Sequence, residues 1–321
     1  MEEIIEIIEK KCVRIKEKDS ILIITDKNKQ KIANKFLNYF KNKNFNVSLV
    51  KTDLQKIDGE EPCREIFYEM QKNNIIFLLT TCSMTHTKAT KTAMEKGAKV
   101  ISMPNITFEA LKFVKTNYEN MEKLTTKIRS LLNKGKNVQI ITDKGTNLIL
   151  DISGMKGFSL YGICKKGNFI NLPDGEAMIC PKTANGVLVI DGSMPPDSEL
   201  DLGKIGKIKN PIKFKIKQGK VFKISGKKEA KILKNVFDKY GESSKVIAEL
   251  GIGTNNSIKK ITGNVTIDEK AYGTIHIAFG DSSCIGGKNV SQVHLDGVIQ
   301  KPCVWIDHKL IINKGKISDN L

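Results

Sequence analysis

The chain changes its hydrophobic pattern near residue 136, and this change constrains the fold more than any other feature. Before it, short apolar runs alternate with amphipathic stretches of helical period. The expected strands are 21–25, 45–51, 75–80 and 98–103, and the expected helices are 29–41, 61–72, 87–97 and 121–134. Alternation of this kind, with strands that are apolar throughout, predicts a parallel sheet covered by helices. We therefore expect a Rossmann-like α/β domain at 1–135.

After residue 136, turn signals become frequent and the segments between them alternate apolar and polar residues. Examples are Asp-Lys-Gly at 143–145, Pro-Asp-Gly at 173–175 and the alternating run 214–217. This pattern predicts a mostly antiparallel β domain at 136–321, of α+β type because one helix is expected at 228–240. A chain of 321 residues is long enough for two such domains.

The formal charge of +18 raises the question of a nucleic-acid partner. Only three of the 53 basic residues are arginine, at Arg14, Arg64 and Arg129. Arginine is the residue preferred for bidentate contacts to phosphates and bases, and no aromatic RNA-binding motif occurs. We therefore predict a lysine-coated surface and no nucleic-acid partner.

The location of the protein is predicted from its apolar runs and its cysteines. No apolar run is long enough to span a bilayer, and residues 1–10 form an acidic amphipathic pattern rather than a signal peptide. The seven cysteines include no Cys-x-x-Cys pair, so we expect thiols in or near the core. These features predict a cytoplasmic protein without a membrane partner.

Residue types that bind metals gather in the second half of the chain. In the expected strand 274–280, period two places His276 on the face opposite Ile275, Ile277 and Phe279. His294 and Asp296 are two residues apart and share a strand face, and Glu176 and Glu249 are isolated carboxylates in apolar settings. Two imidazoles and carboxylates that converge would bind Zn, Co, Mn or Fe(II).

Each of these residues also has a structural explanation when it is taken alone. A strand histidine is usually a structural one, and Glu249 could pair with a lysine. The metal site depends on five such residues, Glu176, Glu249, His276, His294 and Asp296, falling in one domain, and sequence spacing does not prove that they converge.

Three further positions are less certain candidates: two have alternative explanations, and one is expected to have no chemical role. The pair at 268–269 is either an outer pair that orients a ligand or a solvated turn. His86, in Ser-Met-Thr-His-Thr at 83–87, is either an acid, base or substrate contact from the first domain or a surface residue of a capping turn. His308 is expected in a hairpin turn with no chemical role.

With these motifs in hand, the chain resembles the aminopeptidase T family of metallopeptidases and its relatives, the 2,5-dihydroxypyridine 5,6-dioxygenases. The resemblance covers most of the chain and is strongest in 249–255, 268–270, 273–280 and 294–296, with a further match at 171–176. It implies that Glu176, Glu249, His276, His294 and Asp296 are the ligands of a divalent metal centre, with two Zn, Co or Mn ions. It also implies a peptide or small-molecule substrate and a homodimer, and we predict catalytic roles for Glu176, Glu249 and His86.

The resemblance leaves the reaction open, because the peptidases carry a tyrosine a few residues after the matching histidine and the run 280–286 has none. The leading hypothesis is a hydrolase of aminopeptidase type, in which a water activated by metal attacks the peptide bond at a free N-terminus. The alternative is a ring-cleaving dioxygenase with one Fe(II) on His276, His294 and Asp296. A third is a non-catalytic metal- or ligand-binding relative.

Overall fold

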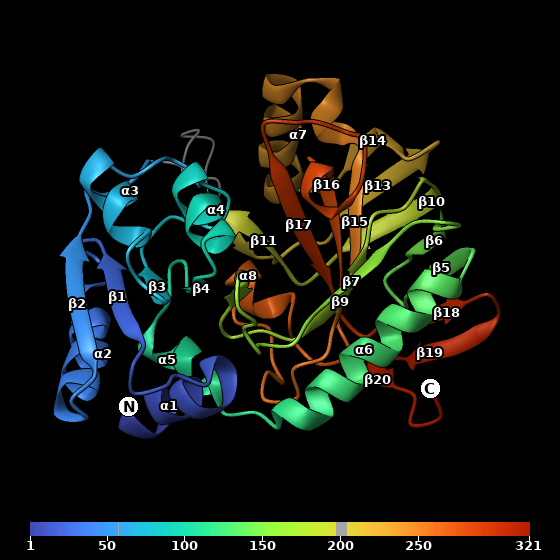
Figure 1. The fold of residues 1–321 in the computed structure, drawn as a ribbon. Helices are drawn as coiled ribbons and strands as arrows, with labels where there is room; N and C mark the ends of the chain where they lie inside the picture. The colour runs from blue at the N-terminus through green and yellow to red at the C-terminus, as the bar shows by residue number, and fades with distance from the viewer. Residues whose placement is uncertain (57, 197–203) are drawn as a thin grey trace. The chain divides into compact units, whose positions relative to one another are not determined.

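The structure is a computed structural model that describes residues 1–56, 58–196 and 204–321. It divides into two compact units, and each is described by itself (Figure 1). The first unit is Met1–Tyr118 with Gly162–Asp174, and the second is Glu119–Tyr161 with Gly175–Leu321.

A five-stranded parallel sheet forms the centre of the first unit, as predicted. Its strand order is β2-β1-β3-β4-β8, with every neighbouring pair parallel. The strands are β1 (Ser20–Thr25), β2 (Asn46–Lys51), β3 (Ile75–Leu79), β4 (Lys99–Ser102) and β8 (Phe169–Asn171). The central residues of β1, β3 and β4 are fully buried, because helices cover both faces of the sheet, whereas the edge strand β2 has no buried residue.

The helices of the first unit lie on the two faces of this sheet. On one face, α3 (Arg64–Met70) and α4 (Lys88–Glu95) share a buried apolar cluster with β1 and β3. On the other, α2 (Gln30–Asn42) packs Phe36 and Phe40 against Phe77 of β3. The remaining helices are α1 (Glu2–Ile7), the π-helix η1 (Ile8–Val13), α5 (Phe108–Leu111) and the 3-10 helix η2 (Lys112–Val114). The first unit is therefore a doubly wound α/β fold.

The units are divided differently from the predicted boundary at residue 135. Helix α6 (Tyr118–Lys134) packs Ile128 and Leu132 into the core of the second unit. Residues 162–174 return to the first unit, where β8 adds the fifth parallel strand beside β4. Pairing between strands this far apart in sequence has no local signal, so the expected domain at 136–321 included this segment.

Antiparallel sheets dominate the second unit, as predicted. An eight-stranded sheet has the order β14-β13-β10-β6-β5-β18-β19-β20, and a five-stranded sheet has the order β17-β16-β15-β9-β7. The first contains β5 (Asn137–Ile141), β6 (Asn147–Asp151), β10 (Thr183–Ile190), β13 (Ile212–Lys217), β14 (Lys220–Ser225), β18 (Cys303–Ile306), β19 (Lys309–Asn313) and β20 (Lys316–Ile317). The second contains β7 (Gly157–Leu160), β9 (Glu176–Ile179), β15 (Ile247–Gly253), β16 (Ile275–Gly280) and β17 (His294–Ile299). A short pair joins β11 (Ser193–Pro196) and β12 (Lys204–Lys207).

One apolar core is shared by the two large sheets and the helices of the second unit. Phe279 of β16 lies 5.0 Å from Phe214 of β13 and 5.6 Å from Phe237 of helix α7 (Lys228–Tyr240), measured between ring centroids. Shorter helical segments complete the unit: η3 (Glu242–Lys245), α8 (Val265–Asp268) and η4 (Ser283–Ile285). Sheet-on-sheet packing of this kind buries one face of the five-stranded sheet and leaves its other face available for polar groups.

Two further observations concern membrane-spanning helices and the state of the cysteines. Among the described residues, no helix has both the length and the apolar character needed to cross a membrane. All seven cysteines are thiols, and Cys12, Cys164 and Cys180 are buried.

Candidate metal centre

The five-stranded sheet brings the sequence-predicted ligands of the second unit to one face. In the ladder, Glu249 of β15 is opposite Ala278 of β16, which is opposite Asp296 of β17. His276 is two residues before Ala278 and His294 is two residues before Asp296, so both histidines point to the same side. Glu176, at the start of β9, is paired with Gly253, four residues after Glu249, and shares this face too.

Small residues on the same face give the long side chains room to meet. The imidazole ring of His276 lies directly over Gly251, and a Cβ atom at that position would overlap the ring. His276 and Glu249 are almost fully buried. The glycine requirement here comes from close approach of a side chain, since Gly251 has no left-handed φ.

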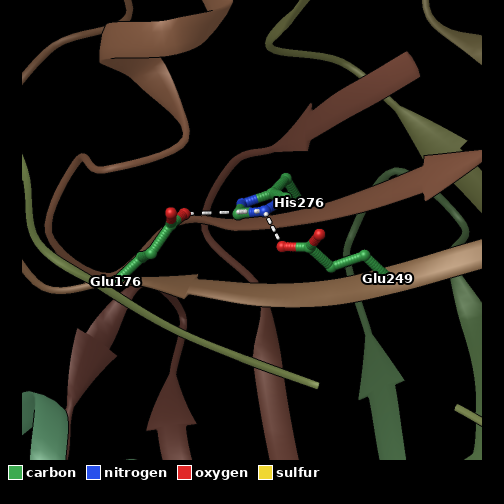
Figure 2. A group of neighbouring side chains, drawn as sticks. All are labelled: Glu176, Glu249 and His276. Atoms are coloured by element: carbon green, nitrogen blue, oxygen red, sulfur yellow. Dashed lines mark hydrogen bonds and ion pairs between the residues drawn. The ribbon is translucent and has the colours of Figure 1, made fainter. Parts of the chain in front are cut away.

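His276 is the centre of the cluster (Figure 2). Its Nε2 lies 3.1 Å from Glu249 Oε1, 3.7 Å from Glu176 Oε2 and 3.9 Å from Asp296 Oδ1. Figure 2 shows the two glutamates reaching the ring from different strands. The spacing is wide enough that a cation between these atoms would contact all of them after small side-chain shifts.

His294 closes the cluster at its more accessible side. Its Nε2 is 3.5 Å from both Glu249 Oε2 and Asp296 Oδ1, and the side chain is 36% exposed. Its Nδ1 is 2.7 Å from the carbonyl oxygen of Asp281 and donates to it, because a carbonyl can only accept. This bond directs the lone pair of Nε2 toward the carboxylates, as in many metal-binding histidines.

Two neighbouring residues also belong to the cluster: Lys270, which sequence reasoning left out, and Glu269, which it considered only as one of an outer pair. Lys270 Nζ lies 2.6 Å from Glu176 Oε1 and 2.6 Å from Glu269 Oε1. Glu269 is buried and is close enough to His276 and Asp296 to be a ligand itself. The available signal was the Asp-Glu-Lys run at 268–270, where charges of both signs stand shortly before a buried strand.

Asp268, the first residue of that run, has a different role. It is fully buried and accepts hydrogen bonds from the backbone N–H groups of Thr262 and Gly263, and from the Thr262 hydroxyl. Asp268 therefore stabilises the loop before α8 and does not orient a metal ligand. The pair is not a solvated turn, because Glu269 is buried as well.

The charges of the cluster shift the pKa values of its members in opposite directions. Burial raises the pKa of Glu176 to about 8, with the charges of Glu269 and Glu249 adding to it and Lys270 opposing it. Burial also raises the pKa of Glu269. For His276 burial lowers the pKa, but the hydrogen bond to Glu249 and the charges of Asp296, Glu249 and Glu176 outweigh it and raise the pKa to about 9. Burial acts against ionisation of Asp296, yet the charge of His294 holds the Asp296 pKa well below its usual range.

The donor atoms fit a divalent metal ion. Glu176 Oε2 and Asp296 Oδ1 are buried and have no hydrogen-bond partner. Such atoms are costly in a folded protein unless something satisfies them, and a cation would. Two overlapping groups among the described residues have ligand atoms within 4.8 Å of one another: Glu176, Glu249 and His276, and Glu269, His276 and Asp296.

The other two histidines lie elsewhere. His86 belongs to the first unit, where its ring contacts Phe169 at 5.9 Å between centroids. Its predicted catalytic contact stays a prediction. His308 has a φ of +72° in the turn between β18 and β19, which agrees with the predicted turn position.

Comparisons with known proteins agree with this fold. The solved structure of 2,5-dihydroxypyridine dioxygenase from Pseudomonas putida KT2440 is similar over 99% of this chain and 96% of its own, with a TM-score of 0.81 and 15% identity. Wild-type AmpT from Thermus thermophilus is similar over 98% of both chains, with a TM-score of 0.70 and 13% identity. At these identities the likeness concerns the fold.

Sequence comparison identifies the family. No curated protein matches the chain. The family model described as 2,5-dihydroxypyridine 5,6-dioxygenase matches residues 8–319, which is nearly the whole sequence and includes every residue of the cluster. Both relatives named from the sequence motifs therefore recur among the similar structures, and the chain belongs to the 2,5-dihydroxypyridine 5,6-dioxygenase (NicX) family.

Proposed function

We propose that this chain is a metal-dependent hydrolase of aminopeptidase type, with Glu176, Glu249, His276, His294 and Asp296 as metal ligands. The observation that supports it is the contact of two glutamates, Glu176 and Glu249, with the same histidine. A two-histidine, one-carboxylate centre needs neither of them. A donor set this rich in carboxylates suits a Lewis-acidic ion that stays in one oxidation state.

The residues of the cluster would have different roles in hydrolysis. A divalent ion held by the cluster would polarise a substrate carbonyl and lower the pKa of a water. Glu176 would bind the ion through Oε2, which has no hydrogen-bond partner, while its Oε1 accepts a hydrogen bond from Lys270. The partly exposed edge at His294 is where a substrate would reach the cluster.

A second candidate is an Fe(II)-dependent ring-cleaving dioxygenase. The family match supports it, and His276, His294 and Asp296 supply two imidazoles and one carboxylate. It predicts one iron per chain and little effect of Glu249→Gln on turnover. The hydrolase predicts that Glu249→Gln removes most of the activity.

The deciding experiment measures metal identity first and turnover second. The protein is purified anaerobically without chelators, and its metals are identified by elemental mass spectrometry. It is then assayed on a peptide panel with free N-termini, on the matched N-acetylated peptides, and by oxygen uptake with 2,5-dihydroxypyridine. Cleavage of the free peptides alone supports the hydrolase, and oxygen uptake supports the dioxygenase.

Two outcomes contradict the proposal outright. If His294→Ala keeps the metal content and the activity of the wild-type protein, the ligand assignment is wrong. If the metal-loaded protein turns over neither peptides nor ring substrates, the chain is a non-catalytic member of its family.

A further inference from the structure

The loop between β16 and β17, residues 281–293, is held together by Asn289. The side-chain nitrogen of Asn289 donates to the carbonyl oxygens of Gly280, at 2.6 Å, and of Ser243, at 2.8 Å. The backbone of Asn289 is paired with Ser282: the Ser282 N–H donates to the Asn289 carbonyl at 3.0 Å, and the Asn289 N–H donates to the Ser282 hydroxyl at 3.2 Å. Asn289 therefore ties the far side of the loop to the end of β16 and to η3.

These bonds fix the two peptide groups on either side of Asp281. In the group before it, the Gly280 carbonyl accepts from the Asn289 side chain. The N–H of the same group, that of Asp281, donates to the Val293 carbonyl at 2.7 Å. In the group after it, the Ser282 N–H donates to the Asn289 carbonyl. Because a trans peptide group is planar, with its C=O and N–H pointing in opposite directions, these bonds also fix the direction of the Asp281 carbonyl.

The Asp281 carbonyl is the acceptor for Nδ1 of His294, at 2.7 Å. His294 depends on this bond more than His276 depends on any, because its side chain is 36% exposed and that of His276 is 1% exposed. The ring of His276 is held by burial and by its packing on Gly251. With the proton of His294 on Nδ1, its Nε2 keeps the lone pair that binding to a metal ion requires.

We propose that Asn289 is a positioning residue of the metal centre: it holds the peptide group between Asp281 and Ser282 so that the carbonyl sets the orientation and tautomer of His294. The inference rests on the proposed function only in requiring that His294 binds a metal ion, and it holds for either chemistry. Asparagine suits this role, because its amide nitrogen carries two N–H groups and donates to two carbonyls at once. An ionised aspartate has nearly the same shape and no donor.

The test is a double-mutant cycle between Asn289 and His294, measured as Zn²⁺ affinity. Asn289→Ala and Asn289→Asp are made in the wild-type protein and in His294→Ala, and affinity is measured by competition with a chromophoric chelator. Asn133→Ala is the matched control. Its Oδ1 also accepts from a backbone N–H of the five-stranded sheet, that of Gly157 at 2.6 Å, but on β7, at the opposite edge from β17.

In the wild-type background we expect both Asn289 substitutions to weaken Zn²⁺ binding by at least about tenfold, the usual effect of losing a group that orients a metal ligand. In the His294→Ala background they should change the affinity by less than about twofold, because the residue through which Asn289 acts has been removed. Asn133→Ala should leave the affinity unchanged.

Proton NMR of the protein loaded with Zn²⁺ gives a second readout. The Nδ1 proton of His294, assigned by its loss in His294→Ala, should give a slowly exchanging signal in the wild-type and control proteins. In the Asn289 variants this proton should exchange with water too fast to be observed, because its acceptor is no longer held in place.

The outcomes separate the inference from the proposed function. No Zn²⁺ bound by the wild-type protein overturns both. Equally tight binding by the wild-type protein and the Asn289 variants overturns the inference alone. An equal loss of affinity in both backgrounds overturns it too, since general damage to the fold would have that effect. If both Asn289 variants stay unfolded at saturating Zn²⁺, the inference is also wrong, because Asn289 is then required for folding.

Discussion

At the scale of single residues, the cluster depends on a missing side chain, at Gly251, as much as on the candidate ligands. Gly251 has no side chain, and the imidazole of His276 occupies that space. The ring is thereby held against the strand with Nε2 directed at Glu249. A ligand fixed by packing and by a hydrogen bond loses little freedom when a metal binds.

Substitution of Gly251 should therefore damage the centre. In Gly251→Ala the new Cβ overlaps the ring of His276, and the strand or the ring must move. We expect metal affinity to fall by at least about tenfold, comparable to the loss of a group that orients a ligand. The measurement is competition for Zn²⁺ between the protein and a chromophoric chelator.

A control separates the collision from a general loss of stability. Gly241 has a φ of +73°, and a Cβ there meets no atom within 4 Å. Gly241→Ala should lower the melting temperature through backbone strain and leave metal affinity unchanged. Equal metal affinity in the two variants would contradict the role given to Gly251.

The thiols offer a test of the first unit that depends on pH. Burial raises the pKa of Cys12 and of Cys164 to about 12, so both stay neutral in the folded protein where an exposed thiol ionises. Between pH 9 and 12 the unfolded state binds fewer protons, and the contribution of these thiols to stability is lost as pH rises. Below pH 9 that contribution is complete.

Alkylation at pH 8 followed by mass spectrometry checks whether the thiols of Cys12 and Cys164 are protected in the folded protein. The exposed Cys63 and Cys284 should react within minutes, and Cys12 and Cys164 should stay unmodified until the protein is denatured. Rapid modification of Cys12 in the folded protein would show that the first unit opens locally.

At the scale of elements, some of the structure follows from periodicity and some does not. Helix α7 spans Lys228–Tyr240, the range predicted from its amphipathic pattern, and β1, β3 and β4 lie within two residues of their predicted limits. Local patterns are sufficient to predict these elements, because the spacing of apolar residues within each segment already shows its period and its buried face.

Other elements depend on contacts that local patterns do not encode. Strand β8 has three residues, and its place beside β4 is set by the tertiary fold. Convergence of the five predicted ligands required the strand register, since one residue of slip would turn Glu249 to the core. Lys270 was missed, and Glu269 was expected only as one of an outer pair, because both lie before β16, where period two does not apply.

Helix α6 gives a prediction for element packing. Leu132 is fully buried in the core of the second unit, whereas Leu131 is only partly buried against it. We expect Leu132→Ala to lower the free energy of unfolding by about 2–5 kcal/mol, because it leaves a cavity. Leu131→Ala should cost clearly less, and urea denaturation compares the two. Equal costs would mean that α6 does not belong to this core.

At the scale of the whole molecule, all the candidate ligands come from one unit. Glu176, Glu249, Glu269, His276, His294 and Asp296 lie in the second unit, whose apolar core is continuous. Metal binding should therefore stabilise that unit. The free energy of binding should add to the stability of the five-stranded sheet.

Metal removal tests this coupling. With metal at about 100 times its dissociation constant, the expected stabilisation is about 2.7 kcal/mol, and a chelator should remove it. Hydrogen exchange measured by mass spectrometry should then rise in β9, β15, β16 and β17 and stay constant in β1 and β3 of the first unit. A uniform rise throughout the chain would contradict a metal confined to the second unit.

The return of residues 162–174 to the first unit means that the polypeptide passes between the two units three times. No single cut in the chain yields two intact modules: a fragment ending before residue 162 lacks β8, and one that begins after residue 118 carries β8 without its neighbour β4. Protein engineers who wish to exchange the first unit for that of a relative must therefore graft two separate stretches at once. The same interleaving makes gain or loss of either unit by simple gene fusion or truncation a poor route for the evolution of this architecture.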